Sequence, residues 1–165
     1  MRLFSLCLCT ACMLFFTSCT PRFAQNPREL APQEFVCDVD ISYRDFTAQA
    51  ILQRTVRGEY TLRYTAPKTI AGLSYGWIAG EVTQGLHSLD EVTPQDPEDF
   101  FSLLVGACET YYGVESEGLS IEKGEDAVRF VHKEFTIAAN PENGQILEIV
   151  FPAQGISVQT KEKIK

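Results

Sequence analysis

The stretch FVCDVDISY, at residues 35–43, alternates apolar and polar side chains from Cys37 to Tyr43. Successive side chains of a β-strand point to opposite faces of the sheet, so every second residue shares a face. One face of this stretch would carry Phe35, Cys37, Val39, Ile41 and Tyr43. The pattern predicts an antiparallel strand that buries one face and exposes the other to solvent.

Two further strands are expected directly after the first, each beginning beyond a polar turn. Arg44-Asp45 and Arg57-Gly58 supply the turns, and residues 47–54 and 60–65 supply the alternating segments. Pro67 has no N–H to donate to a strand ladder, so the third strand should end before it. These segments predict three neighbouring strands in meander order.

Glycine interrupts residues 70–89, where we expect a hairpin that turns near Ala79-Gly80. Glycine within strands is typical of bulges and sharp bends, which make a sheet curl. The C-terminal part of the chain returns to short strand-like segments at residues 119–121, 127–132, 135–139, 146–151 and 156–159. The sequence therefore predicts a mainly β protein built on one curled antiparallel sheet, an open half-barrel.

One well-defined helix is expected near residues 97–109. Asp96 suits the N-cap position, and Pro97 suits the first helical position, where its missing N–H has no intrahelical partner to lose. Apolar side chains then recur around most of the helix circumference at Phe100, Phe101, Leu103, Leu104, Val105, Ala107 and Cys108. A helix this apolar must be nearly enclosed, so we expect it to pack in the concave face of the half-barrel.

The N-terminus has the organisation of a lipoprotein signal. One charge, at Arg2, precedes an uncharged apolar stretch that ends in Thr17-Ser18-Cys19. Small residues suit the peptidase that cleaves before such a cysteine, and the thiol is the group that receives the lipid. An uncleaved membrane anchor and an ordinary secretory signal are the alternatives, but residues 3–19 are at the short end of the roughly 17–25 residues that span a bilayer. We therefore expect residues 1–18 to be removed and Cys19 to carry acyl chains such as palmitate, which would anchor the protein to the extracytoplasmic face of the cell membrane.

The rest of the chain divides into three parts. Residues 19–34 contain three prolines and are expected to form a tether that has neither helix nor strand. Residues 35–160 suit a single β-rich domain, and residues 161–165 form a charged tail that should fray. The net charge of −8 and the lack of basic clusters argue against nucleic acid as a partner.

Motifs for catalysis or metal binding are not found in the sequence. It has no GxSxG, HExxH, P-loop or Gly-rich dinucleotide motif, and its two histidines, His87 and His132, lie far from each other and from any cysteine cluster. Asp38 and Asp40 share a strand face and could act as paired carboxylates, but a solvated acidic face explains them better. We expect no enzymatic activity, no metal and no cofactor.

Two cysteines remain for the folded domain once the signal residues and Cys19 are set aside. Cys37 lies on the apolar face of the first strand, and Cys108 lies on the helix stripe that should face it. In an exported protein two such thiols can form a disulfide, and otherwise they serve as small core residues. The sequence leaves both possibilities open.

Two segments resemble a known family. GEYTLRYTAP, residues 58–67, is similar to the Gly-x-aromatic-x-apolar strand ending in Pro of the lipoprotein-localisation-factor (LolA/LolB-like) superfamily, and FTIAANPENGQI, residues 135–146, resembles its late hairpin. Small uncharacterised lipoproteins of Gram-positive anaerobes look similar overall. The resemblance implies a half-barrel whose apolar concavity, partly closed by helices, accepts acyl chains. Ala66 stands where the family carries Arg before the proline, and the family's periplasmic carrier is soluble, so its membrane-bound members are the better guides.

The aromatic strands and the apolar helix together predict a ligand site between the helix and the concave sheet. We expect the site to be lined by Tyr60, Leu62, Tyr64, Tyr75, Trp77, Phe100, Leu103 and Leu104. The function expected is a membrane-anchored lipoprotein that binds a hydrophobic or amphipathic ligand such as an acyl chain. The alternative is a structural or protein-interaction lipoprotein of the cell envelope whose half-barrel is filled by its own side chains. A cavity within the roughly 300–1,000 Å³ of ligand pockets would favour the first.

The first testable prediction concerns Cys19. Intact-mass analysis of the membrane-extracted protein should show an acylated N-terminal Cys19, because the preceding residues match the requirements of lipid attachment and cleavage. A Cys19→Ala protein should lose this mass and should be released from membranes by a high-salt wash. Retention of the variant on the membrane after that wash would contradict lipid anchoring.

Overall fold

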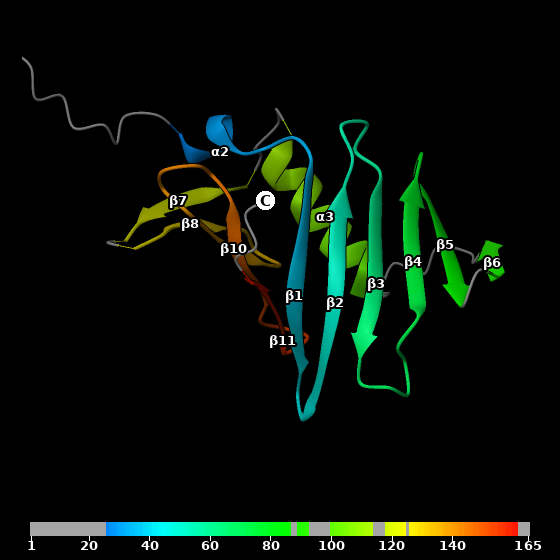
Figure 1. Cartoon of the computed structure of the whole chain (residues 1–165). Coiled ribbons are helices and arrows are strands. Elements are labelled where there is room, and N and C mark those ends of the chain that lie inside the picture. Colours follow the sequence, from blue (N-terminus) through cyan, green and yellow to red (C-terminus); the bar gives the residue numbers. More distant parts are fainter. Residues whose placement is uncertain (1–25, 87–88, 93–99, 114–117, 125, 162–165) are drawn as a thin grey trace, which may run out of the picture.

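The computed structural model describes residues 26–86, 89–92, 100–113, 118–124 and 126–161. The predicted signal peptide, Cys19 and the tail from residue 162 lie outside these ranges. Within the described residues one antiparallel sheet packs against one long helix (Figure 1). No helix in this part of the chain has both the length and the apolar character needed to cross a bilayer.

The sheet has eleven strands among the described residues. They are β1 (Phe35–Tyr43), β2 (Phe46–Arg54), β3 (Tyr60–Ala66), β4 (Leu73–Ile78), β5 (Glu81–Leu86), β6 (Leu89–Val92), β7 (Ser120–Lys123), β8 (Val128–Val131), β9 (Thr136–Ala139), β10 (Ile146–Phe151) and β11 (Ile156–Lys161). Their order across the sheet is β6-β5-β4-β3-β2-β1-β11-β10-β9-β8-β7, and every neighbouring pair is antiparallel. The mainly β, curled antiparallel sheet predicted from the sequence is confirmed.

The order of the strands explains where the helix lies. The chain starts at the centre of the sheet with β1, runs outward to one edge at β6, and resumes at the opposite edge with β7. The helix α3 (Phe100–Tyr112) is part of the connection between these edges and crosses one face of the sheet (Figure 1). The chain then returns to the centre, where β11 pairs with β1.

The helix-facing side of the central strands is the buried one. Cys37 pairs with Leu52, Val39 with Ala50 and Ile41 with Ala48, and all six side chains are buried. The polar residues between them on β1 lie on the opposite face, as the alternation predicts.

Two predicted hairpin turns are confirmed. Tyr43 pairs with Phe46, which leaves Arg44-Asp45 as a two-residue turn between β1 and β2. Ala79 and Gly80 connect β4 to β5, and both have positive φ angles, of 52° and 89°. Two residues with φ above zero match the twist of paired strands. The sequence did not predict β6, because the expected hairpin was taken to extend to residue 89, where β6 begins.

The helix ends later than the sequence predicted. It continues through Tyr112 instead of ending near residue 109, while the predicted start at residues 96–99 lies outside the described ranges. The last turn is held by Tyr111, which is completely buried and donates a hydrogen bond of 2.8 Å to the carbonyl of Gly144. Packing of this side chain therefore extends the helix beyond its predicted end.

The N-terminal segment also differs from the prediction of a tether without helix. Residues Pro27–Leu30 form a single helical turn, α2, and Asn26 caps it by accepting from the N–H of Arg28. Proline does not prevent this turn, because Pro27 stands at its first position. Pro27 and Ala31 are buried, so the segment packs against the domain.

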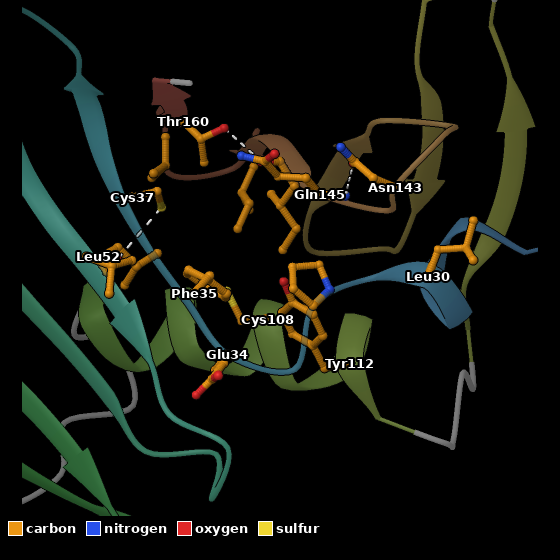
Figure 2. A pocket seen from close by; sticks show the side chains of 15 residues that line it. Leu30, Glu34, Phe35, Cys37, Leu52, Cys108, Tyr112, Asn143, Gln145 and Thr160 are labelled. Carbon is orange, nitrogen blue, oxygen red and sulfur yellow. Dashed lines mark hydrogen bonds between the residues drawn. The ribbon is translucent and has the colours of Figure 1, made fainter. Parts of the chain in front are cut away.

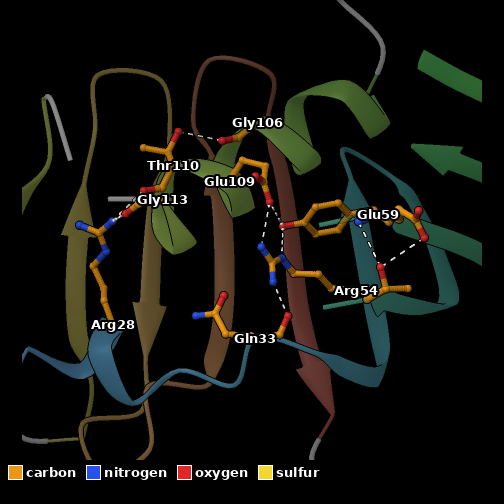
Figure 3. Close-up of polar contacts among 10 residues, drawn as sticks. Arg28, Gln33, Arg54, Glu59, Gly106, Glu109, Thr110 and Gly113 are labelled. Atoms are coloured by element: carbon orange, nitrogen blue, oxygen red, sulfur yellow. Dashed lines mark hydrogen bonds and ion pairs between the residues drawn. The ribbon is translucent and has the colours of Figure 1, made fainter. Parts of the chain in front are cut away.

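Arg54 is the one buried charged side chain among the described residues, with 7% of its surface exposed. Its Nε donates to the hydroxyl of Tyr60 at 2.8 Å, and its Nη2 lies 3.3 Å from Glu109 Oε1 (Figure 3). Its Nη1 donates to the carbonyl of Gln33, and Tyr60 donates to Glu109 at 2.7 Å. One guanidinium thus connects β2, β3, α3 and the N-terminal segment.

We therefore predict that Arg54→Met lowers the free energy of unfolding by about 2 kcal/mol, the cost of several lost hydrogen bonds to a buried side chain. Methionine retains most of the apolar stem, so the loss reports the polar contacts. Arg63→Met is the control, because Arg63 is exposed on β3, and it should change stability by less than about 0.5 kcal/mol. Equal urea midpoints for the two variants would show that the Arg54 contacts do not stabilise the fold.

Candidate functional site

Two cavities lie at opposite ends of α3, between the helix and the sheet. The first has a volume of about 380 Å³ and lies at the C-terminal end of the helix, beside Cys108 and Tyr112. The second has a volume of about 610 Å³ and lies at the N-terminal end, beside Phe100 and Leu103. Both volumes are in the range of small-molecule sites. On β1 the buried Val39 lies between Cys37 of the first cavity and Ile41 of the second.

The first cavity is surrounded by segments that are far apart in the sequence (Figure 2). Its apolar lining comes from α2 and the following residues, from strands β1, β2, β10 and β11, and from α3: Leu30, Pro32, Phe35, Val36, Cys37, Leu52, Cys108, Tyr112, Ile146, Ile149 and Val158. The helix supplies only Cys108 and Tyr112, and the small thiol of Cys108 leaves space where a larger side chain would fill it.

The polar groups of the first cavity that face its interior are uncharged. The hydroxyl of Thr160 donates to the carbonyl of Ile146 at 2.7 Å, and Asn143 Oδ1 accepts from the N–H of Gln145 at 2.9 Å. Glu34 is the one charged residue of the lining, and its carboxylate points away from the cavity (Figure 2). The cavity is therefore apolar with a few neutral hydrogen-bonding groups.

Cys37 and Cys108 both line the first cavity, and the structure has them as free, buried thiols. The sequence correctly placed them in one region, but the disulfide it left open is not formed here. Burial raises the pKa of Cys37 from 9.0 to about 11, with a smaller contribution from Asp38. Burial likewise raises the pKa of Cys108 to about 12. Both groups are therefore neutral thiols near pH 7, the less reactive form.

Arg28 fixes the segment that borders the first cavity. Its Nε donates to the carbonyl of Tyr111 at 2.6 Å, and its Nη2 donates to the carbonyls of Thr110, at 3.1 Å, and Gly113 (Figure 3). These carbonyls belong to the C-terminal end of α3, where a cation is favourable. The next turn of chain, with Leu30 and Pro32, is thereby held against the cavity.

The second cavity has a more open and aromatic rim. It is lined by Ile41, Tyr43, Arg44, Phe46, Tyr64, Phe100, Leu103, Ala153, Gln154 and Ile156. Tyr43 and Phe46 remain 39% and 44% exposed, although both are large and apolar. Arg44 is the single charged residue of this lining, and its guanidinium carbon lies 5.2 Å from the centre of the Tyr43 ring.

The eight predicted lining residues are divided by the structure. Tyr64, Phe100 and Leu103 line the second cavity. The other five line neither cavity, and Tyr60, Leu62 and Leu104 are buried with at most 1% exposed surface.

The contacts of these five residues show that part of the concave face is filled. Tyr75 lies 5.7 Å from the Phe101 ring, and the hydroxyl of Tyr60 belongs to the Arg54 contacts. Trp77 lines neither cavity, so its fluorescence is not a direct reporter of either one.

Sequence reasoning missed most of the first cavity. Ile146, Ile149 and Val158 were recognised only as strand residues, and Leu30 and Pro32 were assigned to the tether. A signal was present in Cys37 and Cys108, because two small residues facing each other leave room.

Among the described residues no group of three metal-ligating side chains is found, and His132 packs on Phe135 at 4.6 Å.

Comparisons with known proteins find similarity among solved structures alone. No family model and no curated protein matches the sequence. Among solved structures, an uncharacterised conserved protein from Thermus thermophilus is similar with a TM-score of 0.53 and 11% identity, over 84% of each chain.

Two further similar structures carry the names expected from the sequence resemblance. One is a LolA superfamily protein from Nitrosomonas europaea, with a TM-score of 0.46 and 9% identity over 84% of this chain and 90% of that one. The other is a putative outer membrane lipoprotein-sorting protein domain from Vibrio parahaemolyticus, with a TM-score of 0.42 and 10% identity over 85% and 89%. At these identities and TM-scores the likeness concerns the fold alone.

The raised thiol pKa values predict alkaline destabilisation. Between pH 9 and pH 11 the unfolded chain loses thiol protons that the folded chain retains, so the free energy of unfolding should fall as the pH rises through this window. Urea unfolding at pH 8 and at pH 10.5 measures the fall. A Cys37→Ala/Cys108→Ala variant should show a smaller fall, because it lacks the two thiols. Some fall should remain, because burial also raises the pKa values of Tyr60, Tyr111 and Tyr112. The same fall in both proteins would contradict burial of the thiols.

Proposed function

We propose that this chain is a lipid-anchored extracytoplasmic protein that binds the apolar chain of an uncharged amphiphile in the first cavity. The observation that carries the proposal is a space of about 380 Å³ lined mainly by apolar side chains and by a few neutral polar groups. Ligand pockets typically combine an apolar lining with few polar groups that orient the ligand.

The charge distribution favours an uncharged head group. None of the described residues that line the first cavity is a cation, and the chain as a whole carries a net charge of −8. Burying an unpaired charge in such a lining is costly. The described residues provide no hydrogen-bond partner for the side-chain amide of Gln145, which leaves it available to a hydroxyl or ester group of a ligand.

The predicted lipid anchor would keep the first cavity close to the membrane. Cys19 precedes Asn26 by seven residues, and a fully extended chain covers at most about 3.5 Å per residue. The start of α2 would therefore stay within roughly 25 Å of the lipid on Cys19. A cavity bordered by α2 is in a position to take an amphiphile from that membrane.

The alternative is a structural or protein-interaction lipoprotein, and one observation favours it. Beneath β3 and β4 the concave face is filled, because Leu62, Leu104 and Phe101 have at most 1% of their surface exposed. That filled region includes Tyr60, Leu62 and Leu104 of the predicted lining, but it does not extend to the C-terminal end of α3, where the first cavity lies. The proposed function therefore depends on the C-terminal end of the helix.

The proposed site is tested by a pair of neighbouring substitutions on β2. Leu52 lines the first cavity, and Ile51 lies on the opposite face of the same strand. Leu52→Trp should fill the cavity and weaken binding of 1-monolauroylglycerol at least about tenfold, a change of about 1.4 kcal/mol. Ile51→Trp should leave the affinity unchanged. The measurement is calorimetric titration of residues 19–165 carrying Cys19→Ala, at ligand concentrations below micelle formation.

Circular dichroism of both tryptophan variants controls for folding. Mass spectrometry of the purified protein should also detect a co-purified neutral lipid. A protein without saturable binding and without co-purified lipid would favour the structural alternative.

A further inference from the structure

We propose that the second cavity is a separate binding site for a single-chain amphiphile with a carboxylate head group, and that Arg44 binds the carboxylate. The proposal concerns the opposite end of α3 and does not rest on the function proposed for the first cavity. It follows from the apolar walls of the second cavity, the placement of its one charge, and the position of the cavity in the fold.

The walls of the second cavity suit an alkyl chain. Ile41 and Ile156 come from adjacent strands, Tyr64 comes from β3, and Phe100 and Leu103 come from the start of α3. The space of about 610 Å³ is larger than the first cavity. Phe46 at the rim is 44% exposed, and contact with a bound chain would remove this apolar surface from water.

The one charged residue that lines the second cavity is a cation, Arg44, whereas the one that lines the first is the anion Glu34. The planar guanidinium group can donate two parallel hydrogen bonds to the two oxygens of a carboxylate. Among the described residues no ion pair with Arg44 is found, although Asp45 follows it in the turn. The ring of Tyr43 lies 5.2 Å from the guanidinium and orients it at the rim, where a head group would lie.

The backbone of Arg44 is unusual for its residue type. Its φ angle is 53°, in the left-handed region, and two-residue hairpin turns with such angles favour Asn, Asp and Gly. An arginine is therefore not selected here by turn geometry. A head-group contact supplies a physical reason for a long cationic side chain at this position.

The position of the second cavity favours a ligand that is soluble as a monomer. The β1–β2 hairpin and α2 lie at opposite ends of β1 (Figure 1). A strand of nine residues is about 30 Å long, so the second cavity, which is lined by Tyr43, Arg44 and Phe46 of the hairpin, lies at the end of the domain that is remote from α2. A single-chain carboxylate can reach it through water, whereas a two-chain lipid is confined to a bilayer.

The head group is tested with sodium dodecanoate and its uncharged counterpart 1-monolauroylglycerol. Both are titrated below micelle formation into residues 19–165 carrying Cys19→Ala. Arg44→Asn suits the turn and should weaken dodecanoate binding at least fivefold, because it removes the guanidinium. The control is Arg57→Asn, which removes the same charge from the exposed turn between β2 and β3 and should have no effect. Equal dodecanoate affinity of the Arg44→Asn and Arg57→Asn proteins would overturn the proposal.

The location of the alkyl chain is tested by Leu103→Trp, which should fill the second cavity and weaken dodecanoate binding at least tenfold. Leu52→Trp, in the first cavity, should leave dodecanoate binding intact. Loss of dodecanoate binding in Leu52→Trp but not in Leu103→Trp would overturn the second site and leave the first. Loss of only the monoacylglycerol affinity in Leu52→Trp would confirm that the two sites are independent.

Discussion

The contacts of Arg54 are the constraint on which the rest of the arrangement depends. A buried guanidinium must be hydrogen-bonded, and here its partners come from Tyr60 on β3, Glu109 on α3 and the carbonyl of Gln33. The guanidinium carbon of Arg54 also lies 4.6 Å from the centre of the Tyr112 ring, and Tyr112 lines the first cavity. The same side chain therefore sets the position of the helix on the sheet and the position of one cavity wall.

The two cavities follow from the lengths of the elements and from side-chain volume. The described part of α3 has 13 residues and is about 20 Å long, whereas β1 has nine residues and is about 30 Å long. The described turns of the helix cover the middle of these strands, and one cavity lies at each end of this described part. The small, neutral thiols of Cys37 and Cys108 preserve the space at one end. Phe101 and Leu104 of α3 instead belong to the filled part of the core, because the Phe101 ring lies 5.7 Å from that of Tyr75 and Leu62 and Leu104 are fully buried.

Local patterns in the sequence predicted ten of the eleven strands, two hairpin turns and the body of the helix, but not β6, α2 or the last turn of α3. The alternation of residues 35–43 predicted β1 and its buried face, because the two faces of a strand differ by one residue along the chain. Asp96, Pro97 and the apolar run predicted the helix, and the order of segments predicted a curled antiparallel sheet. The lipoprotein character of the N-terminus is likewise a prediction from the sequence alone.

The tertiary structure decided which apolar residues enclose a space and which fill it. Tyr60, Leu62 and Leu104 had the same signature in the sequence as Tyr64 and Leu103, yet the first three are completely packed and the last two line a cavity. The first cavity unites residues from Leu30 to Thr160 because β1 pairs with β11. Alternation specifies the face on which a side chain lies, but the partner across the sheet and the reach of the helix are properties of the folded chain, and these determine where space remains.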